Sequence, residues 1–309
     1  MSVIEVNSLT KDYGSGRGVF DVTFQVEKGE VFGFLGPNGA GKSTTIRHLM
    51  GFSKPQSGQT KIFGKDTFDK YFEILGNVGY IPGEIALPAG LTGWEFIRMM
   101  QHLQKCRNDE QLNYLLKIFE LDPSGETKRM SLGVKRKLAV VTAFMSDPDV
   151  LILDEPTSGL DPVMQEVFIE FIRKEKERGK TILLSSHIFS EVDATCDRIA
   201  IIKDGKIVSD FIADDLKHAS QKNYEIGFTD RKNYDRFMKD SRNSAIVKII
   251  GNDAKNKTVM IATDDKYINQ VIAGLSEYSI GNFSHLKETL EDYFMSYYKE
   301  DKNFGGALQ

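Results

Sequence analysis

The sequence predicts an α/β fold in which short buried parallel strands carry functional groups at their carboxyl ends. Three apolar runs of strand type support this prediction, at residues 31–35, 150–153 and 181–184. The first is followed by a glycine-rich loop and a helix, the second by two carboxylates, and the third leads to a histidine. Ligands of open α/β sheets bind outside the carboxyl ends of the strands, so we expect the functional site at this edge.

The glycine-rich segment after the first strand predicts a loop that binds the phosphates of a nucleotide triphosphate. Its glycines allow several backbone N–H groups to turn inward, and the following helix points its positive dipole end at the same place. We expect Lys42 to reach the β- and γ-phosphates and the Ser43 hydroxyl to bind Mg²⁺. A simple glycine-rich turn is the alternative, which Lys-Ser-Thr at the fixed offset disfavours. The predicted nucleotide-binding residues of this loop are Gly36, Pro37, Asn38, Gly39, Ala40, Gly41, Lys42, Ser43 and Thr44.

The two carboxylates after the second strand are the predicted partners of the metal and of the attacking water. Asp154 would hold Mg²⁺, usually through water, and Glu155 would orient and deprotonate the water that attacks the γ-phosphate. Solvation of a strand end explains most Asp-Glu pairs. Here the apolar run before the pair and the phosphate loop upstream favour the catalytic interpretation.

Length and composition fit a cytosolic nucleotide-binding protein with more than one domain. The 309 residues exceed the length at which one hydrophobic core usually keeps growing. The net charge of -4 argues against a nucleic-acid partner. Cys106 and Cys196 are the only cysteines and indicate neither a disulfide framework nor a zinc site. The sequence contains neither an 18-residue apolar run nor a signal peptide, so we expect a cytoplasmic chain.

Further segments follow in the order used by one family. The chain resembles the ATPase subunit of an ABC transporter, which implies a P-loop NTPase fold with an inserted helical lobe. The resemblance implies that His187 contacts the γ-phosphate, that Tyr13 stacks on adenine and that Asp161 belongs to a loop touching the partner subunit's site. A structural histidine and a surface or core tyrosine are the simpler alternatives. The segments are Leu9-Thr10-Lys11-Asp12-Tyr13, Ser158-Gly159-Leu160-Asp161-Pro162 and the strand that ends in Ser185-Ser186-His187.

Residues 130–134 depart from the family pattern. Met-Ser-Leu-Gly-Val stands where the family usually has Leu-Ser-Gly-Gly-Gln. Ser131 and Gly133 remain, and the resemblance implies that they contact the γ-phosphate of a nucleotide held by a second subunit. Leu132 and Val134 affect how tightly such a dimer closes. The variant resembles the antibiotic- and multidrug-export branch of the family.

A second departure lies after the strand-like residues 78–81. Gly83 occupies the position where the family usually has a glutamine that binds Mg²⁺ and senses the membrane partner, and Glu84 follows it. We expect Glu84 to reach the metal or its waters instead. An exposed loop acid is the alternative.

The domain organisation follows from the pattern of elements. Residues 1–215 are expected to form the ATPase domain, with a helical lobe at about 88–146 and a hairpin turn at Asp204-Gly205. Thr92 and Glu95 predict a capping box in that lobe, where Trp94 belongs either to its core or to a groove that receives the membrane partner. Residues 216–309 read as strand, helix, strand, strand, helix, strand, an α+β ferredoxin-like order. A final helix is expected to carry Leu286, Leu290, Tyr293, Phe294 and Tyr297.

Two smaller expectations concern side-chain patterns and partners. Phe20, Val22, Phe24 and Val26 alternate as in a half-buried strand. Because the chain has one copy of each motif, the resemblance implies a homodimer that sandwiches two ATP molecules and drives a separate multi-spanning permease. The subunit would then lie peripherally on the inner face of the membrane. The alternatives are a soluble ABC ATPase acting on ribosomes or nucleic acid, and a nearly idle regulatory ATP-binding module.

Overall fold

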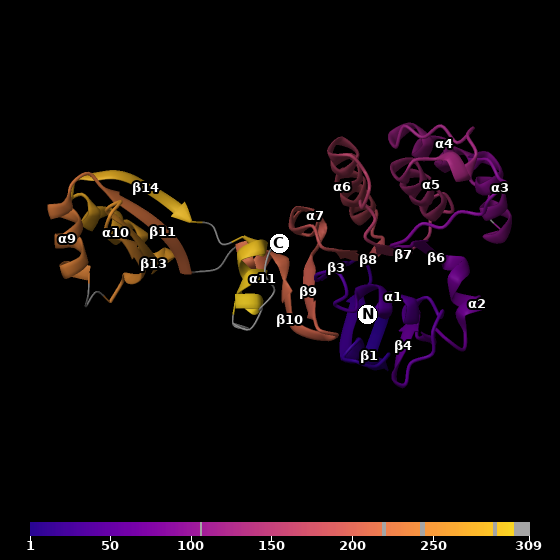
Figure 1. Ribbon diagram of the computed structural model, residues 1–309, viewed down its shortest axis with the longest axis horizontal. Helices are drawn as coiled ribbons and strands as arrows, with labels where there is room; N and C mark the ends of the chain where they lie inside the picture. Colours follow the sequence, from indigo (N-terminus) through magenta and orange to yellow (C-terminus); the bar gives the residue numbers. More distant parts are fainter. Residues whose placement is uncertain (106, 218–220, 242–244, 287–288, 300–309) are drawn as a thin grey trace. The chain divides into compact units, whose positions relative to one another are not determined.

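The chain forms two compact units, Met1–Ala213 and Asp214–Gln309 (Figure 1). The computed structural model describes residues 1–105, 107–217, 221–241, 245–286 and 289–299. The division falls two residues before the expected boundary at 215. Cys106 lies outside the described residues, and Cys196 is a buried free thiol.

A six-stranded sheet forms the centre of the first unit. Its order is β10-β9-β3-β8-β7-β6, in which β10 is antiparallel and the other strands are parallel. Every residue of β3 and β7 is buried, as is every residue of β8, and this confirms the predicted buried strands. The strands are β3 (Val31–Leu35), β6 (Val78–Ile81), β7 (Val150–Asp154), β8 (Thr181–Ser186), β9 (Arg198–Lys203) and β10 (Lys206–Ile212).

An antiparallel sheet packs against the central sheet through a shared apolar core. Its order is β2-β1-β4-β5, from β1 (Ser2–Asp12), β2 (Gly18–Glu27), β4 (Ser57–Ile62) and β5 (Lys65–Asp66). The predicted alternation is confirmed for Val22, Phe24 and Val26 but is wrong for Phe20, which is only partly buried. Asp21 has a positive φ of 56°, so the strand is distorted there and Val19 enters the core instead.

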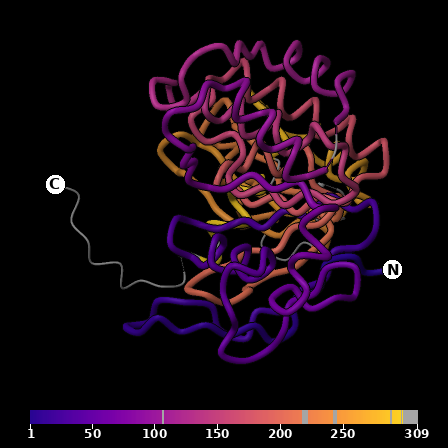
Figure 2. The backbone as a smooth tube through the Cα atoms, turned by 90° about the vertical axis from the view of Figure 1, so that its right-hand side faces the viewer, coloured from indigo at the N-terminus to yellow at the C-terminus, as the bar shows by residue number. Residues whose placement is uncertain are grey.

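Helices connect the strands of this unit. In Figures 1 and 2, α3 (Gly93–Leu103), α4 (Asp109–Ile118) and α5 (Leu132–Phe144) lie on the side away from the antiparallel sheet. The capping box of Thr92 and Glu95 is confirmed at the start of α3. Phe144 of α5 packs edge-on against Phe171 of α6, with ring centroids 4.8 Å apart. The remaining helices are α1 (Lys42–Leu49), α2 (Tyr71–Ile74), α6 (Pro162–Glu177) and α7 (Phe189–Thr195), with 3-10 turns at Leu75–Asn77 and Thr127–Arg129.

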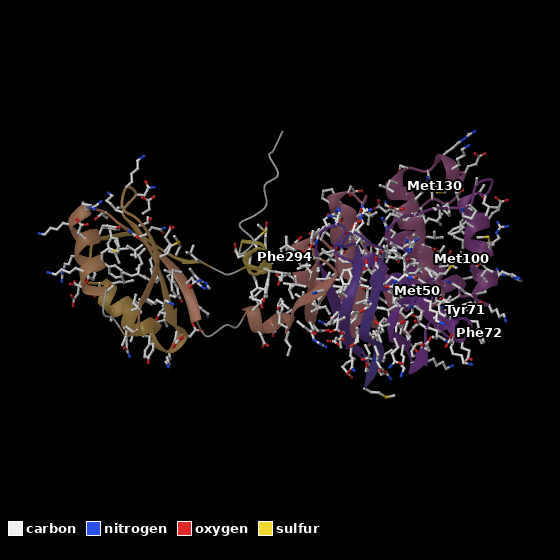
Figure 3. All side chains as sticks on the ribbon, turned by 60° about the horizontal axis from the view of Figure 1, so that its bottom comes forward. Met50, Tyr71, Phe72, Met100, Met130 and Phe294 are labelled. Atoms are coloured by element: carbon white, nitrogen blue, oxygen red, sulfur yellow. The ribbon has the colours of Figure 1, made fainter. Side chains whose placement is uncertain are left out.

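The short helix α2 exposes the rings of Tyr71 and Phe72, which Figure 3 labels at the edge of the unit. No helix in the described part of the chain is long and apolar enough to cross a membrane.

The β9–β10 hairpin supports the glycine-rich loop from behind. Its turn residues Asp204 and Gly205 have positive φ values of 48° and 76°, which confirms the predicted hairpin turn. The Gly205 N–H donates to the Ala40 carbonyl at 2.9 Å, and its carbonyl accepts from the Phe20 N–H at 2.8 Å. The hairpin therefore fixes the backbone of the loop.

The second unit contains a four-stranded antiparallel sheet of order β12-β13-β11-β14. Aromatic and aliphatic side chains of β11 and β13 share one core with α9 and α10. The predicted element order is confirmed, but Leu286 ends β14 and does not belong to the last helix, which begins at Leu290. Helix α8 (Ala213–Lys217) begins at the last residue of the first unit. The other elements are β11 (Gln221–Phe228), α9 (Arg231–Asp240), β12 (Lys248–Asp253), β13 (Thr258–Asp264), a 3-10 turn (Asp265–Tyr267), α10 (Ile268–Leu275), β14 (Ile280–Leu286) and α11 (Leu290–Lys299).

Candidate functional site

Four neighbouring parallel strands deliver the predicted site residues to one edge of the central sheet. The glycine-rich loop follows β3, His187 follows β8, Glu155 follows β7 and Gly83 follows β6. Because β3, β8, β7 and β6 are successive in the sheet, these segments line its carboxyl edge in that order.

The glycine-rich loop has the backbone shape that phosphate binding requires. Gly39 and Gly41 have positive φ values of 84° and 113°. A Cβ on Gly41 would lie 2.7 Å from Val19 Cγ1, so only glycine fits there. Pro37, Asn38 and Gly39 are exposed, as is Ser43 in the first turn of α1. Ala40 is buried, and its N–H donates to the Pro37 carbonyl at 3.2 Å.

Lys42 is only 4% exposed and is bound by the loop that it belongs to. Its ammonium donates to the carbonyls of Gly36 at 2.6 Å and Pro37 at 3.2 Å. It also pairs with Glu155 Oε1 at 3.2 Å. The structure therefore brings together two of the predicted catalytic residues that are far apart in the sequence.

Glu155 bridges Lys42 and His187. Its Oε2 atom lies 3.1 Å from His187 Nδ1, and its backbone has a positive φ of 48°. A left-handed conformation is unfavourable for glutamate, and the Glu155 N–H holds it by donating to the Ser185 carbonyl at 3.0 Å. The carboxylate is thus aimed at the end of β8, while its side chain remains 20% exposed.

Asp154 is buried at the end of β7, where it is 3% exposed. Its Oδ1 accepts from the Ser185 hydroxyl at 2.5 Å. A Cβ on Gly83 would lie 2.9 Å from Asp154 Oδ2, so the loop after β6 passes directly beside this carboxylate. Glu84, the next residue, is exposed.

These residues fit Mg²⁺ bound together with substrate phosphates. No group of three His, Cys, Asp or Glu side chains among the described residues is arranged to hold a metal alone. Mg²⁺ in nucleotide sites is held by one or two carboxylates and by phosphate oxygens and waters. The buried carboxylate of Asp154 and the exposed hydroxyl of Ser43 are groups of the kind that such a site uses.

The other predicted nucleotide contacts lie on exposed segments. Ser131 caps α5 by accepting from the Val134 N–H at 3.3 Å, and Gly133 is in its first turn. Asp161 caps α6 by accepting from the Met164 N–H at 3.0 Å. Tyr13 is 57% exposed in the loop after β1, and the Lys11 ammonium lies 5.8 Å from the centre of its ring.

Three buried residues near the carboxylates were not singled out from the sequence. Ser185 binds both Asp154 and Glu155. Glu191 of α7 accepts from the Ser186 hydroxyl at 2.5 Å, and burial raises its pKa to about 7. Arg136 of α5 donates to three backbone carbonyls of the loops after β6 and β7. The two serines before His187 were the available signal for Ser185; Arg136 and Glu191 look like ordinary surface charges of helices.

Comparisons with known proteins identify the family. A family model described as ABC transporter matches residues 19–158. The bacitracin transport ATP-binding protein BcrA of Bacillus licheniformis is 38% identical over 74% of this chain and 76% of its own length. BcrA of Enterococcus faecalis is 29% identical over 94% of this chain and 95% of its own length.

Solved structures show the same fold. The structure of an ATP-binding subunit of an ABC transporter superposes with a TM-score of 0.65 at 33% identity, covering 70% of this chain and 92% of that one. A dimeric bacterial ABC transporter cassette, 23% identical with a TM-score of 0.62, covers 68% of this chain and 98% of its own. The phosphate loop, the paired carboxylates and the histidine lie at the carboxyl ends of neighbouring parallel strands. The chain belongs to the ABC transporter family as one of its ATP-binding, ATP-hydrolysing subunits.

Proposed function

We propose that this chain powers export of a peptide-like antibiotic through a separate membrane permease. The observation that carries the proposal is the similarity to bacitracin transport ATP-binding proteins, which in one relative extends over 94% of the chain and so includes the second unit. A Nod factor export ATP-binding protein of Paraburkholderia xenovorans, 34% identical over 68% of the chain, supports the export direction.

The proposed reaction uses the contacts between Lys42, Glu155 and His187. The Lys42 ammonium pairs with Glu155 and donates to two carbonyls of its own loop. Phosphate groups in the loop would attract the ammonium away from Glu155, which frees the carboxylate to accept a proton from the attacking water. His187, 3.1 Å from the same carboxylate, would then contact the γ-phosphate. The chemistry is mainly positioning and charge stabilisation.

The proposed metal site contains Ser43 and Asp154, with Glu84 acting on the waters of the ion. Mg²⁺ there would neutralise charge on the phosphate oxygens. Ser185 keeps Asp154 in place through the hydroxyl that binds Oδ1. Tyr13, exposed in the loop between β1 and β2, would stack on adenine.

We further propose a homodimer in which each nucleotide contacts both subunits. Ser131 and Gly133 begin α5 on an exposed turn, where the helix dipole favours an anionic partner. Asp161 would approach the second subunit from the start of α6. The helices α3 to α5 would form the inserted helical lobe that faces the permease, with an open groove lined by Trp94, Arg98 and His102 among other residues as the receiving surface.

The second unit is proposed to be a ferredoxin-like domain. Its order of β11, α9, β12, β13, α10 and β14, and its sheet order β12-β13-β11-β14, support this assignment.

Copurification from the native cell tests the proposal. Glu155→Gln in the tagged full chain should bind ATP, hydrolyse it slowly and remain in the closed dimer. Extraction in mild detergent with ATP should recover a multi-spanning membrane protein in near-equal amount, and the same extraction without ATP and with EDTA is the control. Cells that express the wild-type chain together with the recovered membrane protein should resist a cyclic peptide antibiotic. Cells that express the Glu155→Gln chain with the same membrane protein should not. Recovery of ribosomes or DNA instead would overturn the proposal.

A further inference from the structure

Arg136 is a buried arginine whose guanidinium joins separate segments of the chain. It is 2% exposed, which is rare for an arginine without a paired carboxylate. Its Nε donates to the Ser158 carbonyl at 2.9 Å, and its Nη1 and Nη2 donate to the carbonyls of Pro82 and Gly83, each at 2.8 Å. All three guanidinium nitrogens are therefore used to hold backbone.

The carbonyls that Arg136 binds belong to the two loops that carry the acids of the site. Gly83 lies directly beside Asp154 Oδ2. Ser158 is in the turn after β7, where its own N–H donates to the Glu155 carbonyl at 3.1 Å. One side chain thus fixes the loop beside Asp154 and the turn that follows Glu155.

The helix that carries Arg136 also begins with the proposed contact to the second nucleotide. A Cβ on Gly133 would lie 3.0 Å from the Gly159 carbonyl, and a Cβ on Gly159 would lie 2.8 Å from the Leu132 side chain. The first turn of α5 therefore packs directly on the turn after β7. The hydrogen bond from Arg136 to the Ser158 carbonyl adds to this packing and fixes the turn relative to α5.

The charge of Arg136 strengthens these bonds although its acceptors are neutral. Burial lowers the pKa of Arg136, while the nearby Asp154, Glu155 and Glu191 favour the charged form. None of the ion pairs found in the described part of the chain includes Arg136. Hydrogen bonds from a charged donor are roughly twice as strong as neutral ones, and the planar fork fixes their directions. Displacing either loop from α5 is consequently unfavourable.

We propose that Arg136 is a positioning residue that connects the Ser131–Gly133 turn of α5 to the loops that place Asp154 and Glu155. The inference rests on the proposed dimer, in which that turn binds the nucleotide of the second subunit. When the turn binds the nucleotide of the second subunit, its displacement would also shift Asp154 and Glu155, because α5 and the two loops move together. Arg136 binds the backbone carbonyl of Gly83, so the connection does not depend on the glutamine side chain that the family usually has at this position.

Kinetics and hydrogen–deuterium exchange of the full chain test the connection. Arg136→Met should lower kcat for ATP hydrolysis about 100-fold, the size of loss that a displacement of about 1 Å can cause, with KM changed less than about threefold. In the nucleotide-free chain, exchange should rise in peptides covering 82–87 and 156–160 and stay unchanged in β3 and β8. Arg136→Lys, which keeps the charge without the fork, should recover part of kcat. Lys137→Met on the same helix is the matched control and should keep the wild-type kcat.

Several results would overturn the inference. These are a wild-type kcat for Arg136→Met, a loss confined to KM, or exchange that rises throughout the first unit. If Arg136→Met does not fold, the test rests on Arg136→Lys. A wild-type kcat and unchanged exchange in both loops of Arg136→Lys would exclude the positioning role. Exchange in the nucleotide-free chain judges the connection independently of activity. Absence of hydrolysis in both the wild type and Lys137→Met would count against the proposed function and not against this connection.

Discussion

Glu191→Gln should change how the stability of the first unit depends on pH. The Glu191 carboxyl is 1% exposed, and burial is the main cause that raises its pKa from 4.5 to about 7; the Ser186 hydroxyl partly offsets this effect. Between these two pH values the folded chain holds a proton that the unfolded chain has released. The free energy of unfolding therefore falls as pH rises through this range.

The size of the effect follows from the two pKa values. Each pH unit of difference is worth about 1.4 kcal/mol, so the wild-type chain should lose about 3 kcal/mol from this group between pH 4.5 and 7. The loss is complete above pH 7. Glutamine has the same shape, stays neutral and can still accept from the Ser186 hydroxyl, so Glu191→Gln should lack this loss and be more stable than the wild type at pH 8.

Denaturant unfolding followed by tryptophan fluorescence measures this difference. Trp94 is the only tryptophan and lies in α3, so its signal reports on the first unit alone. Wild type and Glu191→Gln are compared from pH 5 to 8.5, with Glu166→Gln, at an exposed position of α6, as the control. Equal pH dependence in wild type and Glu191→Gln would refute the argument that a buried carboxyl at this position controls it.

Three further predictions concern the nucleotide site. Gly83→Ala should raise the Mg²⁺ concentration for half-maximal ATP hydrolysis about tenfold, because its Cβ would lie 2.9 Å from Asp154 Oδ2. Gly76→Ala, whose Cβ would have no atom within 4 Å, is the control, and equal Mg²⁺ requirements would contradict the prediction. Tyr13→Ala should raise KM for ATP about tenfold with kcat unchanged, since ring stacking is worth about 1 kcal/mol or more; Tyr13→Phe should behave as wild type, and a fall in kcat alone would exclude stacking. Ser185→Ala should lower kcat about tenfold in steady-state assays, because the buried Asp154 carboxylate loses the hydrogen bond that the Ser185 hydroxyl donates. A wild-type kcat would mean that Asp154 keeps its position without this hydrogen bond.

The sequence predicted the site residues that follow buried strands. Lys42, Glu155 and His187 each come after a short apolar run of strand type, and parallel strands deliver their carboxyl ends to one edge. Local chemistry was therefore enough to place them. The hairpin at Asp204-Gly205 was predicted for the same reason, since its turn residues determine its geometry.

The residues that the sequence did not reveal depend on contacts between distant segments. Arg136 stands between two lysines and looks like part of a solvated helix face, yet its partners are carbonyls of Pro82, Gly83 and Ser158. Local patterns carry no information about such partners. The prediction for Phe20 was wrong for a related reason. Asp21 has a positive φ, which changes the side chains of β2 that face the core.

The support of the phosphate loop by Gly205 has a consequence for the order in which the protein matures on the ribosome. Strand β3 and its loop are made early, but both neighbours of β3, strands β8 and β9, and the turn that binds Ala40 come from the last part of the first unit. Contacts between segments so far apart form late, because the intervening chain must be present and its loop closed. A nascent chain that stops before the β9–β10 hairpin therefore has the complete nucleotide-binding motif in its sequence but lacks the partners that give it shape. We therefore expect the loop to take its final shape only when nearly all of the first unit has been synthesised.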